Sequence, residues 1–298
     1  MELVLIHFVV PALVGVFIGI ASGLLGIGGG TIMVPVFRLA FGMSAVASTA
    51  TSLFTIIPTS ISGAASHLRN KTCLPALGVA AGIGGALTSP VGVWLAHLSP
   101  GWLVMVAAAL IIGYSAWNMF RKALKMKPAG AKAVQATAAG EVPAAARSGA
   151  AAPAAPAVSA SAAAPAPDDH PRLSRRQLLI GGAIGLAAGL ASGYVGVGGG
   201  FIMVPLMLSL VGIPMRLASG TSLIAVMILA VPGVVEQAFL GSINYVAGIA
   251  IAVGSIPGAV VGARLVKKVP ERTLRFVFSG FLVVAAVLLA VNELGVWG

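Results

Sequence analysis

The stretch that decides the fold is ASGLLGIGGGTIMVP at residues 21–35, because it recurs as ASGYVGVGGGFIMVP at residues 191–205. Eleven of the fifteen positions are identical. The match continues without a gap to the tripeptide Thr-Ser-Leu, at residues 51–53 and again at residues 221–223, which fixes the offset at 170 residues. A repeat of this kind predicts an internal duplication, with one homologous unit in each half of the chain.

The composition around these two stretches is that of a membrane protein. Hydrophobic residues make up 58% of the chain, charged residues 8%, and the mean hydropathy is +1.04. These values exclude an ordinary soluble domain. Since a spanning helix needs about 20 apolar residues, we expect an all-α polytopic membrane protein. Four hydrophobic segments are expected in each half, eight in all, at residues 3–41, 46–66, 74–96, 101–120, 177–211, 217–237, 243–264 and 273–292.

The two halves are separated by a segment of a different composition. Residues 128–171 are rich in Ala, Pro, Ser and Gly and lack aromatic residues, so they cannot bury enough surface to offset chain entropy. Nine of the eighteen Lys and Arg lie between Arg121 and Arg176. We therefore expect a first transmembrane repeat at 1–120, a disordered cytoplasmic tether with basic flanks at 121–176, and a second repeat at 177–298.

The first segment of each half is interrupted by three consecutive glycines. The piece that follows them in the second half, residues 201–211, would reach only about 17 Å as a helix, which is too short to span. If each broken segment enters the membrane and returns to the same side, three crossings remain in each half. The second repeat is then inverted relative to the first.

The positive charges favour this re-entrant arrangement. In it, the Lys and Arg clusters fall on one side, which is cytoplasmic by the positive-inside rule. These clusters include Arg69, Arg216 and residues 267–275, and only Arg38 fits poorly. The net charge of +11 therefore reports topology, and no nucleic-acid partner is expected.

The broken segments are the expected substrate site. Irregular backbone within a membrane is tolerated only where protein or a water-filled cavity covers it. A helix that starts just after the glycines, at Thr31 or Phe201, directs free N–H groups and the positive end of its dipole toward that cavity, which favours an anion. The expected substrate-binding residues are Gly28, Gly29, Gly30, Thr31, Thr51, Ser52, Gly198, Gly199, Gly200, Phe201, Thr221 and Ser222.

Three further residues are candidates for supporting roles at this site. Pro35 and Pro205 lack an amide hydrogen, which predicts a helix break or a gate one turn after the glycines. Arg38 lies inside a re-entrant segment, where its charge would attract anions. The alternatives are that the glycines only permit tight helix packing and that the hydroxyls bond to their own helices.

Other kinds of site are not favoured by the sequence. The chain has seven carboxylates, and only Glu236 lies near a hydrophobic segment; His67 and His97 lie near segment ends, where an interfacial role is the commoner one. The single cysteine, Cys73, excludes a multi-cysteine metal site. The glycine spacing lacks the strand and acidic residue of a dinucleotide fingerprint. No metal, cofactor or catalytic residue is expected.

The duplicated GxGGGxxxVP motif, followed by GxxxxxAxxTSL in the second half, resembles the sulfite exporter TauE/SafE family, also described as toluenesulfonate uptake permeases. The likeness covers both halves and leaves out the tether. It implies movement of sulfite, sulfonates or related organic anions across the bacterial inner membrane. Carried over to this sequence, the family motif corresponds to Gly28, Gly29, Gly30, Pro35, Gly198, Gly199, Gly200 and Pro205.

We therefore expect a secondary transporter, with export favoured by the resemblance. The chain has no nucleotide-binding domain or P-loop and so cannot hydrolyse ATP itself. We therefore expect transport to be linked to protons. Its partners are a small anion and the lipid bilayer, and homo-oligomerisation is left open. The alternatives are a transporter of carboxylates and an intramembrane enzyme or assembly factor. An enzyme would require a nucleophile with a base, or clustered His and Asp, and neither is evident.

Overall fold

The computed structural model describes residues 8–125 and 173–293, which are helical and contain no β-strand. This confirms the expected all-α class. In chain order, the helices are α2 (Val10–Leu25), α3 (Gly30–Phe41), α4 (Ala45–Arg69), α5 (Pro75–Leu98), α6 (Gly101–Lys125), α8 (Arg175–Val195), α9 (Gly200–Leu206), η2 (Met207–Val211), α10 (Met215–Phe239), α11 (Tyr245–Leu265) and α12 (Glu271–Glu293).

Seven of these helices are long and apolar enough to cross a membrane: α4, α5, α6, α8, α10, α11 and α12. The chain is therefore a multi-pass membrane protein. Shorter apolar helices occur at α2, at α3 and over Gly200–Val211. The expected broken segment 177–211 thus divides into a 21-residue α8 and a short second arm. The count of eight segments and the repeat architecture remain predictions.

The expected tether falls largely outside the described residues. Within its expected bounds of 121–176, residues 121–125 form the end of α6 and residues 175–176 begin α8. Ser174 starts α8 with a capping box, because its hydroxyl accepts from the Arg176 amide and its own amide donates to Gln177.

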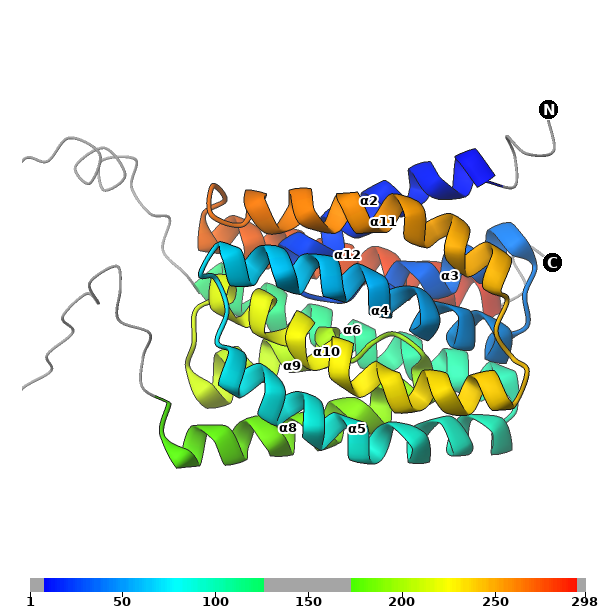
Figure 1. Cartoon of the computed structure of the whole chain (residues 1–298), viewed down its shortest axis with the longest axis horizontal. Coiled ribbons are helices and arrows are strands. Elements are labelled where there is room, and N and C mark those ends of the chain that lie inside the picture. Colours follow the sequence, from blue (N-terminus) through cyan, green and yellow to red (C-terminus); the bar gives the residue numbers. More distant parts are fainter. Residues whose placement is uncertain (1–7, 126–172, 294–298) are drawn as a thin grey trace, which may run out of the picture. The chain divides into compact units, whose positions relative to one another are not determined.

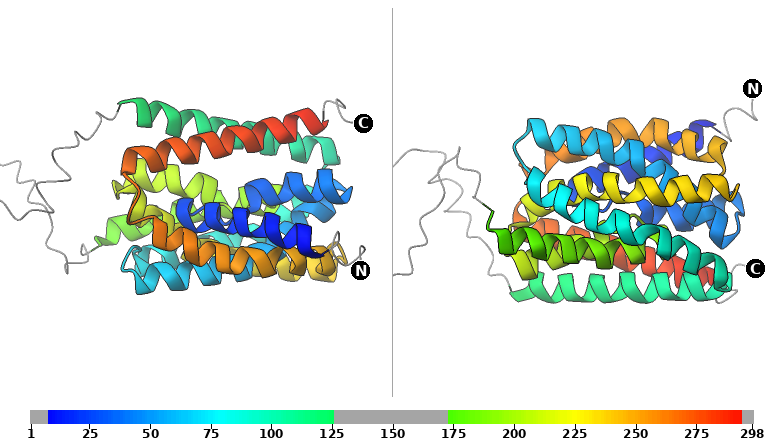
Figure 2. Two further views of the ribbon diagram at one scale, coloured as in Figure 1. Left: turned by 90° about the horizontal axis from the view of Figure 1, so that it is seen from above. Right: turned by 60° about the horizontal axis from the view of Figure 1, so that its bottom comes forward.

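The path of the chain defines two ends of the helical bundle (Figures 1 and 2). At one end, the basic end, α6 finishes and α8 begins, and the α4–α5, η2–α10 and α11–α12 connections lie there. The α3–α4, α5–α6 and α10–α11 connections lie at the opposite end. Among the described residues, every Lys and Arg except Arg38 lies at or near the basic end.

Both broken segments turn back inside the bundle. In Figure 1, α2 enters from the opposite end and α3 returns to it, whereas α8 enters from the basic end and α9 with η2 returns there. Each arm stops at a glycine in the left-handed conformation. Gly26 follows α2 with a φ of 74°, and Gly196 follows α8 with a φ of 73°.

Helices of the two halves interlock through small residues. On α2, any Cβ added at Gly15, Gly19 or Gly23 would come within 2.3 Å of a carbonyl oxygen of α11. The same holds for glycines of α8, such as Gly185 and Gly189, against carbonyls of α5. Glycines spaced four residues apart allow such close helix contact within a membrane. The two halves therefore form one compact unit and not separate bodies.

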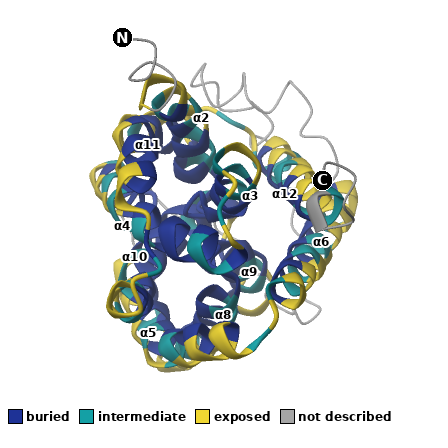
Figure 3. Cartoon of the chain, turned by 90° about the vertical axis from the view of Figure 1, so that its right-hand side faces the viewer, coloured by how far each residue is buried: buried dark blue, intermediate teal, exposed yellow. Residues whose placement is uncertain are grey.

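Figure 3 shows where this packing leaves the short arms. Seen along the bundle, α3 and α9 lie between a row formed by α11, α4, α10 and α5 and the separate pair α6 and α12. Each short arm contacts both sides, since α3 packs on α4 and α12, and α9 packs on α10 and α6. The two short arms are thus enclosed by long helices.

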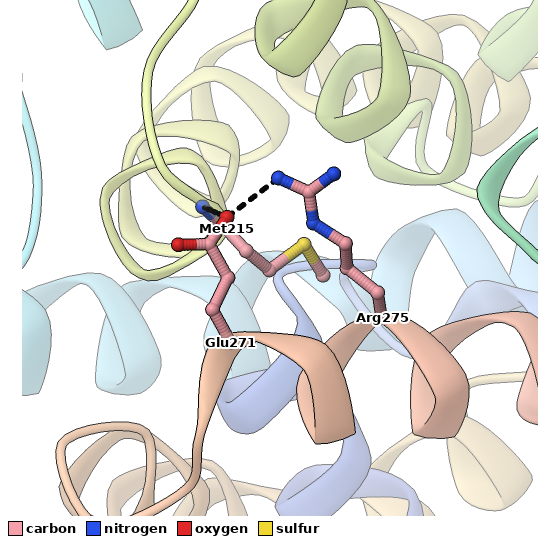
Figure 4. Close-up of polar contacts among 3 residues, drawn as sticks. All are labelled: Met215, Glu271 and Arg275. Carbon is pink, nitrogen blue, oxygen red and sulfur yellow. Dashed lines mark hydrogen bonds and ion pairs between the residues drawn. The ribbon is translucent and has the colours of Figure 1, made fainter. Parts of the chain in front are cut away.

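A carboxylate at the basic end joins the start of α12 to α10 (Figure 4). Glu271 Oε1 accepts from Arg275 at 2.5 Å and from the Met215 backbone amide, the first of α10, at 3.3 Å. The carboxylate therefore satisfies one of the orphan donors at the N-terminus of α10. Arg216 adds a second link, because its guanidinium donates to the Val269 carbonyl at 3.1 Å.

Candidate functional site

The first break is a run of backbone that only glycine adopts readily. After Gly26, the φ angles of Gly28 and Gly29 are 82° and 86°, in the left-handed region that disfavours residues with a side chain. The next helix begins at Gly30, one residue before the expected Thr31. Its first hydrogen bonds are those from the Ile32 and Met33 amides to the Gly29 carbonyl.

The second break has the same geometry. The φ angles of Gly198 and Gly199 are 86° and 68°, and the next helix begins at Gly200, again one residue before the expected Phe201. The Ile202 and Met203 amides donate to the Gly199 carbonyl. The conformation of the chain therefore recurs, together with its sequence, at the offset of 170 residues.

The two breaks cross in direct contact. A Cβ added at Gly30 would lie 2.4 Å from the Val197 carbonyl oxygen, and one added at Gly200 would lie 2.4 Å from the Gly26 carbonyl oxygen. Residues 25–30 and 195–200 are all buried. At Gly30 and Gly200, the packing role considered as an alternative is therefore present in the structure.

Two apolar side chains lie at the crossing. Ile56 of α4 and Val226 of α10 are both fully buried, and each is next to Gly28 and Gly198. They are equivalent to one another at the 170-residue offset. The Ser60 hydroxyl lies 3.7 Å from the Cβ position of Gly28, so the crossing also has a polar group.

Three of the expected hydroxyls already have structural partners. Thr51 Oγ1 accepts from the Asn244 amide at 3.0 Å, and Thr221 Oγ1 accepts from the Leu74 amide at 2.9 Å. These amides stand at the starts of α11 and α5, so both threonines cap another helix. The Ser222 hydroxyl donates to the Gly26 carbonyl at 2.7 Å and thereby holds the first break.

Other hydroxyls are buried and, within residues 8–125 and 173–293, have no hydrogen-bond partner. They include Thr31 and Ser52, which are among the expected substrate-binding residues, and five others. Ser22 and Ser192 lie beside Gly29 and Gly199, one at each break. Both serines occupy the same place in the repeated motif, and this duplication could have identified them from the sequence. The full set is Ser22, Thr31, Ser48, Ser52, Ser60, Ser89 and Ser192.

The supporting candidates lie away from the crossing. Pro35 and Pro205 are buried inside α3 and α9, and after Pro205 the helix changes to the π-type turn η2. Ser209 donates to the Pro205 carbonyl at 2.8 Å. Arg38 is half-buried in the last turn of α3, where it donates to the Met43 carbonyl at 3.5 Å, so the structure does not bring it to the breaks.

One buried ionisable residue was not expected at this site. His67, expected at an interface, is fully buried, with Nε2 at 2.8 Å from the Gly23 carbonyl oxygen, three residues before the first break. A second polar cluster lies at the opposite end, where His97 contacts Gln237 at 3.1 Å. The described residues contain no group of three or more His, Cys, Asp or Glu able to hold a metal.

Comparison with known proteins identifies the family of the chain. The profile of the family described as "Sulfite exporter TauE/SafE" matches residues 11–289, from the start of α2 almost to the end of α12. The chain belongs to this family. It is therefore a membrane transporter and not an enzyme.

Relatives of this TauE/SafE protein occur in Bacillus subtilis strain 168. It is 24% identical to the "Probable membrane transporter protein YunE" over 278 residues, covering 90% of this chain and 91% of the relative. It is 26% identical to the "Probable membrane transporter protein YdhB", covering 88% of this chain and 92% of the relative. No solved structure matches the chain significantly.

Proposed function

We propose that this protein is a secondary transporter that exports small sulfur-containing anions, such as sulfite or organosulfonates, across the inner membrane in a proton-linked cycle. The description of its family supports both the sulfur anion and the direction. The observation that carries the proposal is the buried crossing of two broken helices beside hydroxyls that lack a partner in the described part of the chain.

The donors at the crossing suit an oxyanion. In α3, helical hydrogen bonding begins with the Ile32 and Met33 amides, so the amides of Gly30 and Thr31 precede it. Amides at a helix start, with the positive end of its dipole, attract negative charge. The hydroxyls of Thr31, next to Gly30, and of Ser60, beside Gly28, add neutral donors, and Ser52 lies one helical turn before Ile56 on α4. Such donors bind an anion without the desolvation cost of a buried cation.

The path of the chain supports an inverted repeat. The first broken segment enters and leaves at the opposite end, and the second does so at the basic end. Their partners are exchanged in the same way, since α2 packs on α11 and α8 packs on α5. In transporters of this design, the substrate binds where the repeats meet at the membrane midplane. The excess of Lys and Arg at the basic end supports a cytoplasmic position for it.

The substrate site in this proposal comprises Gly28 to Gly30 with Thr31 and Ser52, and Gly198 to Gly200 with Phe201. Thr51, Thr221 and Ser222 support it through the bonds described above. Because both breaks are buried, substrate reaches them only when the long helices move apart. A carboxylate substrate is the second candidate, because the same amides and hydroxyls would accept it.

The test is anion flux in proteoliposomes. We would measure uptake and efflux of sulfite, an organosulfonate and a carboxylate, with and without an imposed pH gradient. Ser52→Ala and Ser60→Ala remove hydroxyls that have no partner among the described residues, so we expect folded variants with flux reduced about tenfold. Ser99→Ala is the control, because it removes a half-buried hydroxyl that donates to the Leu95 carbonyl at the end of α5, away from the crossing. If only carboxylates are transported, the substrate is a carboxylate and not a sulfur anion. If Ser52→Ala and Ser60→Ala both transport at the wild-type rate, the proposed substrate site is wrong.

A further inference from the structure

The imidazole of His67 links the end of the first broken helix to the connection between α4 and α5. Its Nε2 lies 2.8 Å from the Gly23 carbonyl oxygen of α2, and its Nδ1 lies 2.7 Å from the Thr72 hydroxyl. The residue is fully buried. Gly220 of α10 lies against the ring, and a Cβ there would come within 2.8 Å of it. The ring, which α4 carries, therefore contacts α2, the α4–α5 connection and α10 at once.

The contact with Gly23 exists because the helix is broken. In a continuous helix, the Gly23 carbonyl would accept from the amide four residues later. Here α2 ends at Leu25, and the last helical bond is that from the Gly26 amide to the Ser22 carbonyl. The Gly23 carbonyl is one of the orphan acceptors of this terminus. His67 supplies the missing donor from another helix.

This arrangement can hold the imidazole in either protonation state. When the ring is neutral, Nε2–H donates to Gly23 and Nδ1 accepts from the Thr72 hydroxyl. When a proton binds at Nδ1, that nitrogen donates to the Thr72 oxygen. The hydroxyl can then turn to the His67 carbonyl, which lies 3.4 Å away. Rotation of one hydroxyl is the only change required.

The surrounding charges are few. The described part of α2 contains no titratable residue, and α10 contributes Arg216 one turn before Gly220. The α4–α5 connection contributes Arg69, Lys71 and Cys73, and α11 contributes Arg264. Burial raises the pKa of Cys73 to about 11, so its thiol is neutral near pH 7. Burial of the ring and these cations oppose a further positive charge, whereas the bond to the Gly23 carbonyl at the end of α2 favours one.

The second half lacks a corresponding titratable group. At the 170-residue offset, Gln237 takes the place of His67. Gln237 is also fully buried, but it contacts His97 at 3.1 Å, and its amide nitrogen has no partner in the described part of the chain. A glutamine cannot change charge. At this position, therefore, the first half has a titratable group and the second half does not.

We propose that His67 is the proton-binding residue that couples pH at the basic end to the first broken helix. The inference deepens the proposed function and rests on it for its role in transport. A hydrogen bond from an imidazolium to a carbonyl is stronger than one from a neutral ring. Protonation therefore strengthens the bond that holds the end of α2. Loss of the proton weakens this bond and allows the movement that opens the site.

The test compares His67→Gln with His97→Gln. Glutamine at position 67 keeps an N–H donor for Gly23 and copies the residue of the second half, so the variant should fold. We would measure amide hydrogen exchange of residues 21–30 from about pH 4 to 8, a range that extends well below the ordinary pKa of histidine, corrected for intrinsic exchange. In the wild type and His97→Gln, exchange should slow about fivefold on acidification. In His67→Gln it should not change with pH.

Flux in proteoliposomes separates the two proposals. If His67→Gln transports sulfur anions and a pH gradient still accelerates it as in the wild type, His67 is not the coupling residue, while the proposed function stands. If no sulfur anion is transported but the pH-dependent exchange is lost only in His67→Gln, the proton site stands and the proposed substrate fails. Should His67→Gln not fold, Thr72→Val removes the partner of Nδ1 alone, and an unchanged pH profile of exchange would overturn the inference.

Discussion

The hydroxyl of Ser222 donates a hydrogen bond of 2.7 Å to the carbonyl oxygen of Gly26, and this bond joins α10 to the break between helices α2 and α3. At the equivalent position of α4, Ser52 is buried without a partner in the described part of the chain. The two serines belong to the same repeated tripeptide. One copy therefore holds the backbone, and the other is the one that the proposed substrate site includes.

This difference predicts that the same substitution lowers stability at position 222 and transport at position 52. Ser222→Ala removes a buried hydrogen bond and leaves the Gly26 carbonyl without this donor, so unfolding free energy should fall by about 1–3 kcal/mol. Ser52→Ala removes a hydroxyl with no partner in residues 8–125 and 173–293, so stability should change by less than about 0.5 kcal/mol, while flux falls. Thermal unfolding in detergent and flux in proteoliposomes measure the two effects. Equal loss of stability in both variants would contradict the assignment.

The two threonines of the repeat should act on stability in the same way. Thr51→Val and Thr221→Val keep the side-chain shape but remove the acceptors for the Asn244 and Leu74 amides. Each variant should lose about 1–3 kcal/mol of unfolding free energy. The apparent KM of the remaining folded transporter should stay within about twofold of the wild type. A large increase in KM with unchanged stability would show that these threonines bind substrate and do not mainly support the fold.

The sequence predicted much of this architecture because its strongest signals are local. Hydropathy gave the long helices, and the glycine motif gave both breaks, since positive φ angles at Gly28 and Gly198 are properties of the residues themselves. The helix starts were placed one residue late, at Thr31 and Phe201. A glycine with an ordinary φ angle gives no sign of whether it belongs to the turn or to the helix.

The partners of the polar groups could not be predicted. Thr51 accepts from an amide 193 residues away, and His67 meets Gly23 through a contact between α4 and α2. Such pairs depend on how the halves interlock, which a single sequence does not reveal. His67 was expected at an interface because it lies near the end of its segment. It is buried because Gly220 leaves space for its ring.

The thiol of Cys73 should be almost inert in the folded protein. Burial raises its pKa from its ordinary value near 9 to about 11, and the side chain is 2% exposed. At pH 8 roughly one thiol in a thousand is ionised, and the thiolate is the reactive form. Alkylation should be at least about a hundredfold slower than in denaturant and should accelerate toward pH 11.

The sign of the linkage gives a second measurement for the same residue. A thiol with a raised pKa stabilises the folded state below about pH 9, and this contribution is lost as the pH rises through about 11. Cys73→Ala should therefore flatten the decline of stability between these two values. Rapid alkylation of the folded protein at pH 8 would show that the connection between α4 and α5 opens readily.

The crossing of the two breaks predicts that single methyl groups are poorly tolerated there. Gly30 and Gly200 have ordinary φ angles, so an alanine meets only a steric obstacle, the carbonyl oxygens of Val197 and Gly26 at 2.4 Å. These oxygens belong to the backbone, so the breaks themselves must separate. We expect Gly30→Ala and Gly200→Ala to lose about 1–3 kcal/mol of stability and most of their flux.

Gly113→Ala and Gly280→Ala are the matched controls for these variants. They lie within α6 and α12, and a Cβ at either would meet nothing within 4 Å. Within a helix, alanine is about 1 kcal/mol more favourable than glycine. Both controls should therefore unfold at the wild-type temperature or above. If Gly30→Ala were as stable and as active as Gly113→Ala, the breaks would not be in contact in the transporter, and an anion site at their crossing would lose its structural basis.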